Sequence, residues 1–333
     1  MISIDLELAW GTFDFEYGPK LLERARWTSD EAIPILLGQL EKNGLAATWA
    51  IVGFVMLNAL SDCPKLTEVH YPHFTRPWLS YAEAAAESDF SCWFAPRTVN
   101  RIRGIKPTQE IGAHSLSHVI FGDPGTPRQR AEEELRLCQS IAHELGIELK
   151  SFVFPRNSID HLDALSQAGF KCYRSPDVLP LSLRIPRGPA LSGVACDVLG
   201  IAPRPVVPID KNGLVEIPGS LMVRDMKAWR GLIPDRVRLK RLNNGLRVVA
   251  EEGGVYHIWL HPESLFHRRP RLEMVLAEFF ENAGSMVRSG KLRCLTMGQL
   301  AAETQKLDTG QFEALNEVSV RSDILASQSL NSL

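Results

Sequence analysis

The stretch MISIDLE, residues 1–7, alternates apolar and polar side chains with a period of two. This spacing predicts a β-strand, because successive side chains of a strand point to opposite faces. The apolar residues would then face covering helices, whereas Asp5 and Glu7 would share the other face. The stretch therefore predicts a strand that buries one side and presents two neighbouring carboxylates on the other.

Short apolar runs of this kind alternate with helical patterns along the chain. Strands are expected at residues 1–7, 47–54, 110–114, 150–155, 170–175, 214–220, 255–260 and 292–296. Helices are expected at residues 29–44, with Ser29 as the N-cap, and at 96–105, 126–146, 158–169, 234–252 and 270–289. Such alternation predicts a parallel sheet covered by helices. Seven or eight units in about 300 residues favour an α/β fold of the distorted TIM-like (β/α)7-8 barrel class.

The composition of the sequence indicates how the domains are arranged and which kinds of partner are not expected. Hydrophobic residues make up 45% of the 333 residues, which is enough for a large core. We expect one barrel over residues 1–305 with an insert at about 56–106, and a polar tail at 306–333 typical of disorder. A net charge of −2 gives no general attraction to nucleic acid. The sequence lacks an apolar run of about 18 residues, so no integral membrane segment is expected.

Two features favour a cytoplasmic location. The six cysteines are scattered and form no Cys-x-x-Cys motif, which is typical of reduced thiols. Met1 leads directly into the first strand instead of a basic and then apolar leader, so no signal peptide is expected.

Polar residues with catalytic potential follow four of the expected strands. EIGAHSLSH, residues 110–118, carries two histidines four positions apart, a spacing that can put both imidazoles on one metal-binding face. Because reactive residues gather at the carboxyl ends of barrel strands, we expect all of these side chains to lie near one another. The candidates are Asp5, Glu7, His114, His118, Arg156, Asn157 and His261.

Less specific interpretations exist for each candidate. Asp14 and Glu16 form a second acidic pair, but turn residues on both sides interrupt a strand there, so we favour Asp5 and Glu7. The two histidines of EIGAHSLSH could simply be hydrogen-bonded residues near a helix start. His261 could be a core or capping histidine, and Arg156 a surface arginine. A further histidine, His257, is expected at the barrel floor.

The ordered series SIDLELAWG, AATWAIVG, EIGAHSLSH, FVFPRN and VYHIWLHP resembles the polysaccharide deacetylase superfamily, the NodB-homology or carbohydrate esterase family 4 group. The resemblance spans roughly residues 1–300. It is to a variant branch, in which Asp5-Leu6-Glu7 followed by Trp10-Gly11 replaces the common motif with adjacent acids. It implies a barrel of the NodB-homology type that hydrolyses an acetyl group from a sugar amide or ester.

The resemblance also implies a metal site. Glu7, His114 and His118 would hold a divalent metal ion, with Zn2+ as the expected ion. Asp5 would be the general base that accepts a proton from the attacking water. Arg156 would pair with Asp5 and orient it, although it lies in Phe-Pro-Arg-Asn instead of the common Arg-x-Pro form.

The remaining implied roles concern the leaving group and the substrate. His261 would be the general acid, with the residue that tunes it left open between Asp197 and Asp225. A backbone N–H near Asn157 would stabilise the oxyanion. Trp10 would bind a sugar ring, with core packing as the alternative. The aromatic insert could likewise overhang the site or pack into the core.

Three functions follow from this resemblance. The first is a metal-dependent deacetylase of an N-acetylated saccharide, a precursor of a surface polysaccharide such as O-antigen or capsule. The basic run between Arg224 and Arg241 is typical of a solvated face but could contact a lipid- or nucleotide-linked sugar. The second is a hydrolase of another carbon–nitrogen bond. The third is a non-catalytic carbohydrate-binding protein with the same fold.

Overall fold

The computed structural model describes residues 1–15, 18–62, 65–71, 74, 77–79, 90–178, 196–224, 232–266 and 269–307. The expected tail beyond residue 307 lies outside the described residues. Nine strands of the described chain form one sheet in the order β6-β7-β5-β4-β3-β2-β1-β9-β8. They are β1 (Ile2–Leu6), β2 (Thr48–Ile51), β3 (Glu110–Ala113), β4 (Ser151–Val153), β5 (Cys172–Ser175), β6 (Ile209–Lys211), β7 (Leu214–Pro218), β8 (Leu221–Val223) and β9 (Ile258–Leu260).

The sheet curls round on itself. β7 lies near one end of the strand order and β8 at the other, yet only Gly219 and Ser220 separate them in the chain. The Gly219 N–H donates to the carbonyl of Ser175 and the Ser220 N–H to that of His257, so this link bonds to both ends of the sheet. All neighbouring strands are parallel except the β6–β7 pair. The predicted distorted (β/α) barrel is therefore confirmed.

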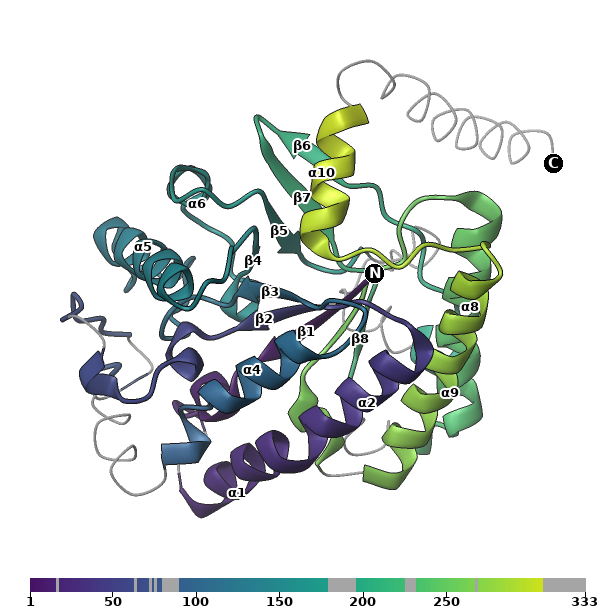
Figure 1. The fold of residues 1–333 in the computed structure, drawn as a ribbon, viewed down its shortest axis with the longest axis horizontal. Coiled ribbons are helices and arrows are strands. Elements are labelled where there is room, and N and C mark those ends of the chain that lie inside the picture. Colours follow the sequence, from purple (N-terminus) through teal and green to yellow (C-terminus); the bar gives the residue numbers. More distant parts are fainter. Residues whose placement is uncertain are drawn as a thin grey trace.

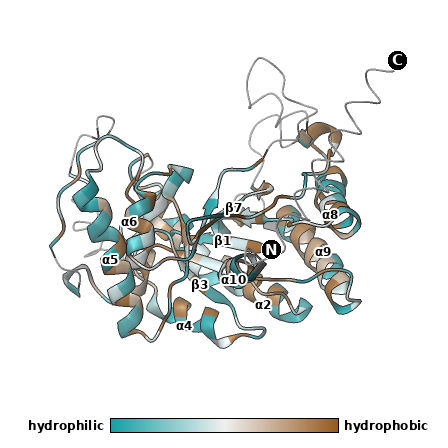
Figure 2. Cartoon of the chain, turned by 90° about the horizontal axis from the view of Figure 1, so that it is seen from above, coloured by the Kyte–Doolittle hydropathy of each residue, from teal (hydrophilic) through white to brown (hydrophobic). Residues whose placement is uncertain are grey.

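Helices surround this curled sheet (Figure 1). They are α1 (Pro19–Trp27), α2 (Ile33–Asn43), α4 (Pro96–Gly104), α5 (Arg128–Glu144), α6 (Leu162–Gln167), α8 (Asp235–Glu252), α9 (Arg269–Arg288) and α10 (Met297–Leu307). Figure 2 shows hydrophobic and hydrophilic residues alternating around several of them, as expected of helices that bury one face. No described helix is long and apolar enough to cross a membrane.

Two predicted helix starts and one predicted strand are wrong, and one of these helices, expected from residue 158, begins at Leu162. Ser29 does not begin a helix, because α1 continues through a π-helical turn, Thr28–Ala32, into α2. Residues 292–296 do not form a strand, because both edges of β1 are already paired, with β2 and β9. The segment instead leads into α10, whose first N–H groups bond to Thr48 and Glu110 at the starts of β2 and β3.

The described part of the insert packs into the core. Most of its described aromatic residues are buried, Phe90 being exposed, and edge-to-face ring contacts join three of them to Phe13 and Trp10. The Trp78 indole N–H also donates to the carbonyl of Ser117, 2.8 Å away, which ties the insert to the loop that carries the two histidines. The buried aromatic residues are Tyr71, Phe74, Trp78, Trp93 and Phe94, whereas His73 lies outside the described residues.

Candidate active site

The structure brings five of the predicted site residues to the carboxyl ends of three strands, β1, β3 and β9. Asp5 lies within β1, and Glu7 directly follows this strand. Their side chains point the same way, because alternate residues of a strand share a face. His114 follows β3, and the loop after β3 carries His118. His261 follows β9, which pairs with β1 on the side opposite β2. The curl of the sheet therefore converts distant sequence motifs into one cluster.

Three of these side chains form a candidate metal centre. The Oε1 atom of Glu7 lies 3.0 Å from Nε2 of His114 and 3.2 Å from Nε2 of His118. One potential ligand atom from each residue lies within 4.8 Å of the others, and all three residues are buried. In a tetrahedral zinc site, ligand atoms about 2.0–2.2 Å from the ion lie about 3.3 Å or slightly more from one another. The observed separations are close to that value.

The protonation of His114 also fits a cation. Its Nδ1 lies 2.7 Å from the carbonyl oxygen of Val153, which can only accept, so Nδ1 carries a proton. Nε2 is then the nitrogen that could bind a cation, and it faces the Glu7 carboxylate. Burial lowers the pKa of His118, which favours the neutral form that binds metals. The residues present therefore fit a divalent metal ion.

A buried carboxylate shapes the loop that carries His118. His118 has a left-handed φ of 61°, which is uncommon for a residue other than glycine. Oε2 of Glu134, on α5, accepts the backbone N–H groups of Leu116 and Ser117 at 2.7 and 2.8 Å. Its Oε1 accepts the Ser117 hydroxyl at 2.6 Å and the Arg130 guanidinium at 2.9 Å. This charge-assisted network stabilises the loop conformation that points His118 at Glu7.

Asp5 pairs with an arginine that the sequence analysis did not single out. Nη1 and Nη2 of Arg174, on β5, donate to the two carboxylate oxygens of Asp5 at 2.7 and 2.6 Å. Both side chains are buried. Burial alone would raise the pKa of Asp5, but Arg174 outweighs it, with help from His114 and His261, and holds this pKa below its usual value. Asp5 is therefore an ionised carboxylate beside the candidate metal ligands.

The predicted pairing of Arg156 with Asp5 is wrong. Arg156 lies in a 3-10 turn after β4 with φ 57°, and its Nη2 donates to both carboxylate oxygens of Asp14 at 2.6 and 2.7 Å. Its guanidinium also lies 4.2 Å from the centre of the Phe15 ring. Arg174 donates to both carboxylate oxygens of Asp5, whereas Arg156 pairs with Asp14 of the second acidic pair. Glu16 lies outside the described residues.

These two ion pairs should contribute unequally to stability. Arg174→Met leaves Asp5 buried without a cation, so we expect the free energy of unfolding to fall by about 3–5 kcal/mol. Arg156→Met should cost less, because the Arg156 side chain is 23% exposed, so water screens its pair with Asp14 better than it screens the fully buried Arg174–Asp5 pair. Urea denaturation of both variants measures the difference. Equal losses would contradict the assignment of Arg174 as the main partner of a buried charge.

His261 lies over the carboxylates and carries a charge. Its Nε2 lies 3.3 Å from Oε1 of Glu7 and 3.6 Å from Oδ2 of Asp5, and its side chain is 19% exposed. Burial opposes protonation, but Glu7 and Glu263, together with Asp5, raise the pKa of His261 to about 10. Burial in turn raises the pKa of Glu263 to about 7. His261 can therefore donate a proton at neutral pH.

Of the two aspartates expected to tune His261, only Asp197 lies among the described residues, and it has another partner. Asp197 pairs with Arg241, and Asp225 lies outside the described residues. The carboxylates that act on His261 are those of Glu7, Glu263 and Asp5. Glu263 lies only two positions after His261, but its Oε2 is buried without a hydrogen-bond partner among the described residues. Its proximity to His261 in sequence was the signal that could have identified it.

Of the two residues predicted to bind substrate, Trp10 is buried in the core and Asn157 is partly exposed beside the site. Trp10 is fully buried, and its indole N–H donates to the carbonyl of Trp93 at 2.8 Å. It cannot stack on a sugar, so the core-packing alternative holds. Asn157 is partly exposed and borders a cavity beside the site. Its own backbone N–H is already bonded to Phe154, 2.9 Å away, so an oxyanion donor would have to be another group.

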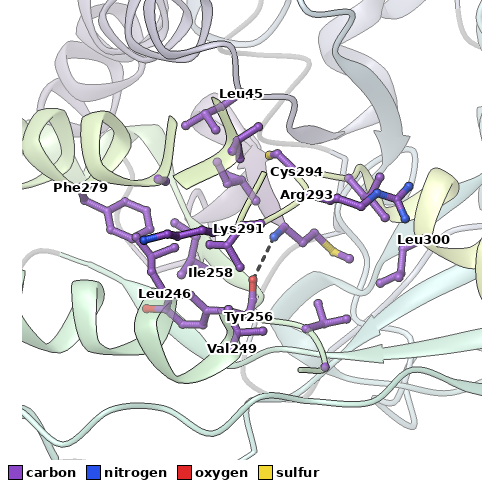
Figure 3. Close-up of a pocket in the computed structure, with 18 of the residues that line it drawn as sticks. Leu45, Leu246, Val249, Tyr256, Ile258, Phe279, Lys291, Arg293, Cys294 and Leu300 are labelled. Atoms are coloured by element: carbon purple, nitrogen blue, oxygen red, sulfur yellow. Dashed lines mark hydrogen bonds between the residues drawn. The ribbon is translucent and has the colours of Figure 1, made fainter. Parts of the chain in front are cut away.

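A mainly apolar cavity of about 450 Å³ lies at the opposite end of the sheet (Figure 3). Met1, Ile258, Phe279 and Leu246 are among its lining residues. It therefore adjoins the starts of β1 and β9, whereas the histidines and carboxylates lie at strand ends. None of the five clustered residues lines it, so this cavity is separate from the candidate active site.

Comparisons with known proteins agree with this architecture. No protein-family model matches the sequence, and no curated protein sequence matches it. Solved structures do match. One, assigned as a polysaccharide deacetylase from Mycobacterium smegmatis, shares 14% identity with a TM-score of 0.60, over 92% of this chain and 90% of that one.

Two further structures match over similar lengths. One, assigned as a polysaccharide deacetylase from Pseudomonas aeruginosa PAO1, shares 12% identity with a TM-score of 0.55, over 90% of this chain and 88% of that one. The allantoinase PuuE shares 14% identity with a TM-score of 0.56, over 93% and 90%. At these identities the likeness establishes a common fold. The chain therefore has the fold of the polysaccharide deacetylase superfamily, which its sequence motifs resemble.

Proposed function

We propose that this protein is a metal-dependent hydrolase that removes acetyl groups from an N-acetylated saccharide. The observation that carries the proposal is the convergence of Glu7, His114 and His118 on one point, beside Asp5 and His261. Two imidazoles and one carboxylate are a common ligand set of catalytic zinc sites. The fold shared with solved polysaccharide deacetylases supports the same reaction class.

Asp5 is suited to act as the general base. A divalent cation held by Glu7, His114 and His118 would supply Lewis acidity, which lowers the pKa of a water molecule and polarises a carbonyl group. Arg174 keeps Asp5 ionised while leaving each of its carboxylate oxygens a further lone pair. Asp5 can therefore accept a proton from the attacking water.

His261 is suited to act as the general acid. Hydrolysis of an acetamide yields acetate and an amine, and the amine must be protonated as the carbon–nitrogen bond breaks. The imidazolium of His261 is partly exposed and lies above the two carboxylates, so it faces the place where a substrate would enter. Asp5 and His261 thereby divide the proton transfers between one base and one acid.

The substrate is proposed to be a phosphate-bearing saccharide, either lipid- or nucleotide-linked, that serves as a cytoplasmic precursor of a surface polysaccharide. A cavity of about 350 Å³ adjoins the site, where Asn157 and Trp259 both contact Arg174. Guanidinium groups suit phosphate recognition. The charged residues that line this cavity are Arg224, Arg238, Arg241, Asp177 and Asp197.

A second candidate is the hydrolysis of another carbon–nitrogen bond. The likeness to an allantoinase favours it, because its TM-score falls between those of the two assigned deacetylases. The same base and acid would serve a different amide. A non-catalytic carbohydrate-binding role is less well supported, because a binding protein needs neither an arginine-paired Asp5 nor a protonated His261.

Acetate release tests the proposal. Zinc-loaded protein should release acetate from at least one member of a panel of N-acetylated oligosaccharides, lipid-linked sugars and nucleotide-linked sugars. A chelator should stop the release and added Zn2+ should restore it. Ammonia or urea release from cyclic and linear ureides, without any acetate, would instead establish the second candidate.

A further inference from the structure

A chain of buried hydrogen bonds runs from Arg174 to the floor of the barrel. Nη1 of Arg174 lies 3.1 Å from Oγ of Ser3, and that hydroxyl lies 2.9 Å from Nε2 of His257. Nδ1 of His257 lies 3.1 Å from the carbonyl oxygen of Pro218. Ser3 and His257 are fully buried, and the proposed reaction uses neither of them directly.

The direction of each hydrogen bond follows from the donors and acceptors present. The Pro218 carbonyl can only accept, so Nδ1 of His257 carries the proton. Burial lowers the pKa of His257 to about 3, so its imidazole is neutral and Nε2 must accept. The single Ser3 proton therefore goes to His257. The oxygen of Ser3 is left to accept from Arg174, which has no acceptor of its own.

This relay determines the orientation of the Arg174 guanidinium. One proton of Nη1 goes to Asp5 and the other to Ser3, while the ring of Trp259 lies 4.0 Å from the guanidinium carbon. Nε of Arg174 has no hydrogen-bond partner among the described residues. Besides Asp5, Ser3 at 3.1 Å and Oδ1 of Asn157 at 3.5 Å resist rotation of the guanidinium within its own plane, and Ser3 makes the shorter contact. That rotation would break the two-point contact with Asp5.

We propose that Ser3 and His257 are positioning residues, which hold Arg174 so that it presents Asp5 to the attacking water. The proposal rests on the proposed function, because Asp5 matters as a base only if the site is hydrolytic. Ser3 and Asp5 share one face of β1. One strand therefore carries both the proposed base, Asp5, and the hydroxyl that holds its partner, Arg174. A hydroxyl that donates to His257 is also a stronger acceptor for Arg174.

Ser3→Ala is the smallest change that cuts the relay. Because Asp5 keeps its partner but loses its fixed orientation, kcat should fall about tenfold with KM and metal content nearly unchanged. The matched control is Ser151→Ala, since Ser151 is equally buried on β4 but its hydroxyl bonds to Glu110, 2.6 Å away. That control should lose stability while keeping kcat. Equal kcat values for Ser3→Ala and wild type would overturn the proposal.

Two further comparisons separate positioning from general stability. His257→Gln can still accept from Ser3 through its amide oxygen, so it should retain more of kcat than His257→Leu. In an Arg174→Lys background, Ser3→Ala should add little further loss, because no guanidinium remains to be oriented. A loss in the double variant equal to the product of the single losses would show that Ser3 does not act through Arg174.

Nuclear magnetic resonance of 15N-histidine provides a measurement that needs no activity. His257 should show the neutral Nδ1–H tautomer at neutral pH, and Ser3→Ala should shift its Nε2 resonance. An Nε2–H tautomer in the wild type would overturn the relay. Absence of acetate release by the wild type would count against the proposed function, whereas the tautomer measurement judges the hydrogen-bond relay separately.

Discussion

Replacing His114 and His118 together with alanine should abolish metal binding and, with it, hydrolysis. The wild-type protein, purified without chelator, should contain about one divalent ion per chain, because the two groups of potential ligands in the described structure share Glu7 and so form one centre. Of the proposed ligands the double variant keeps only Glu7, and Asp5 of the second group has both carboxylate oxygens bonded to Arg174, so the ion should be lost. Elemental analysis and titration with Zn2+ measure the loss. Activity should fall to background.

Two controls make this result specific. His70 and His143 are exposed on the surface, so their double alanine variant removes the same number of imidazoles and should keep the ion. Asp5→Asn should also keep the ion while losing activity, because Asp5 is engaged by Arg174 and is not among the proposed ligands. Full occupancy in the His114→Ala, His118→Ala protein would refute the proposed centre.

The clustering of the candidate residues could be predicted because it depends on strand ends. Period-two patterns identified β1, and reactive residues of parallel barrels gather at the carboxyl edge. Glu7, His114 and His261 each directly follow a strand, so the order of motifs was sufficient to bring them together. No knowledge of side-chain distances was required for that step.

The partner of Asp5 could not be predicted by the same reasoning. β1 and β5 are separated in the sheet by β2, β3 and β4, so their side chains meet only across the interior of the curled sheet. Both Arg156 and Arg174 lie near strand ends, and sequence spacing does not distinguish which one points inward. The one available signal was an arginine within FKCYRS, a short stretch expected to be a strand.

Trp10 shows a second limit of sequence reasoning. An aromatic residue near a saccharide site can stack on a sugar or fill the core, and both uses have the same local sequence. The outcome depends on the insert, whose Trp93 and Phe94 pack around Trp10. Propensities do not predict how a long insert folds back, so burial of Trp10 required the three-dimensional structure.

His261→Ala should separate the two kinds of acetyl substrate. Expulsion of an amine requires a proton, so loss of the acid should lower the rate on an N-acetyl sugar by about a hundredfold or more. A nitrophenyl acetate has a leaving group that departs without protonation, so the same variant should lose much less activity on it. Rates of the wild type and the variant on both substrates give the loss on the amide relative to the loss on the ester.

The physical basis of this expectation is the charge on His261. Its pKa is raised by the carboxylates beneath it, so at neutral pH the imidazolium carries the proton that an amine needs. The variant should retain its metal ion, since Glu7, His114 and His118 are untouched, and metal analysis checks this. Equal losses on the amide and the activated ester, with metal retained, would mean that His261 positions the substrate instead of protonating the leaving group. A selective loss on the amide would establish its role as the acid, because only proton donation distinguishes the two leaving groups.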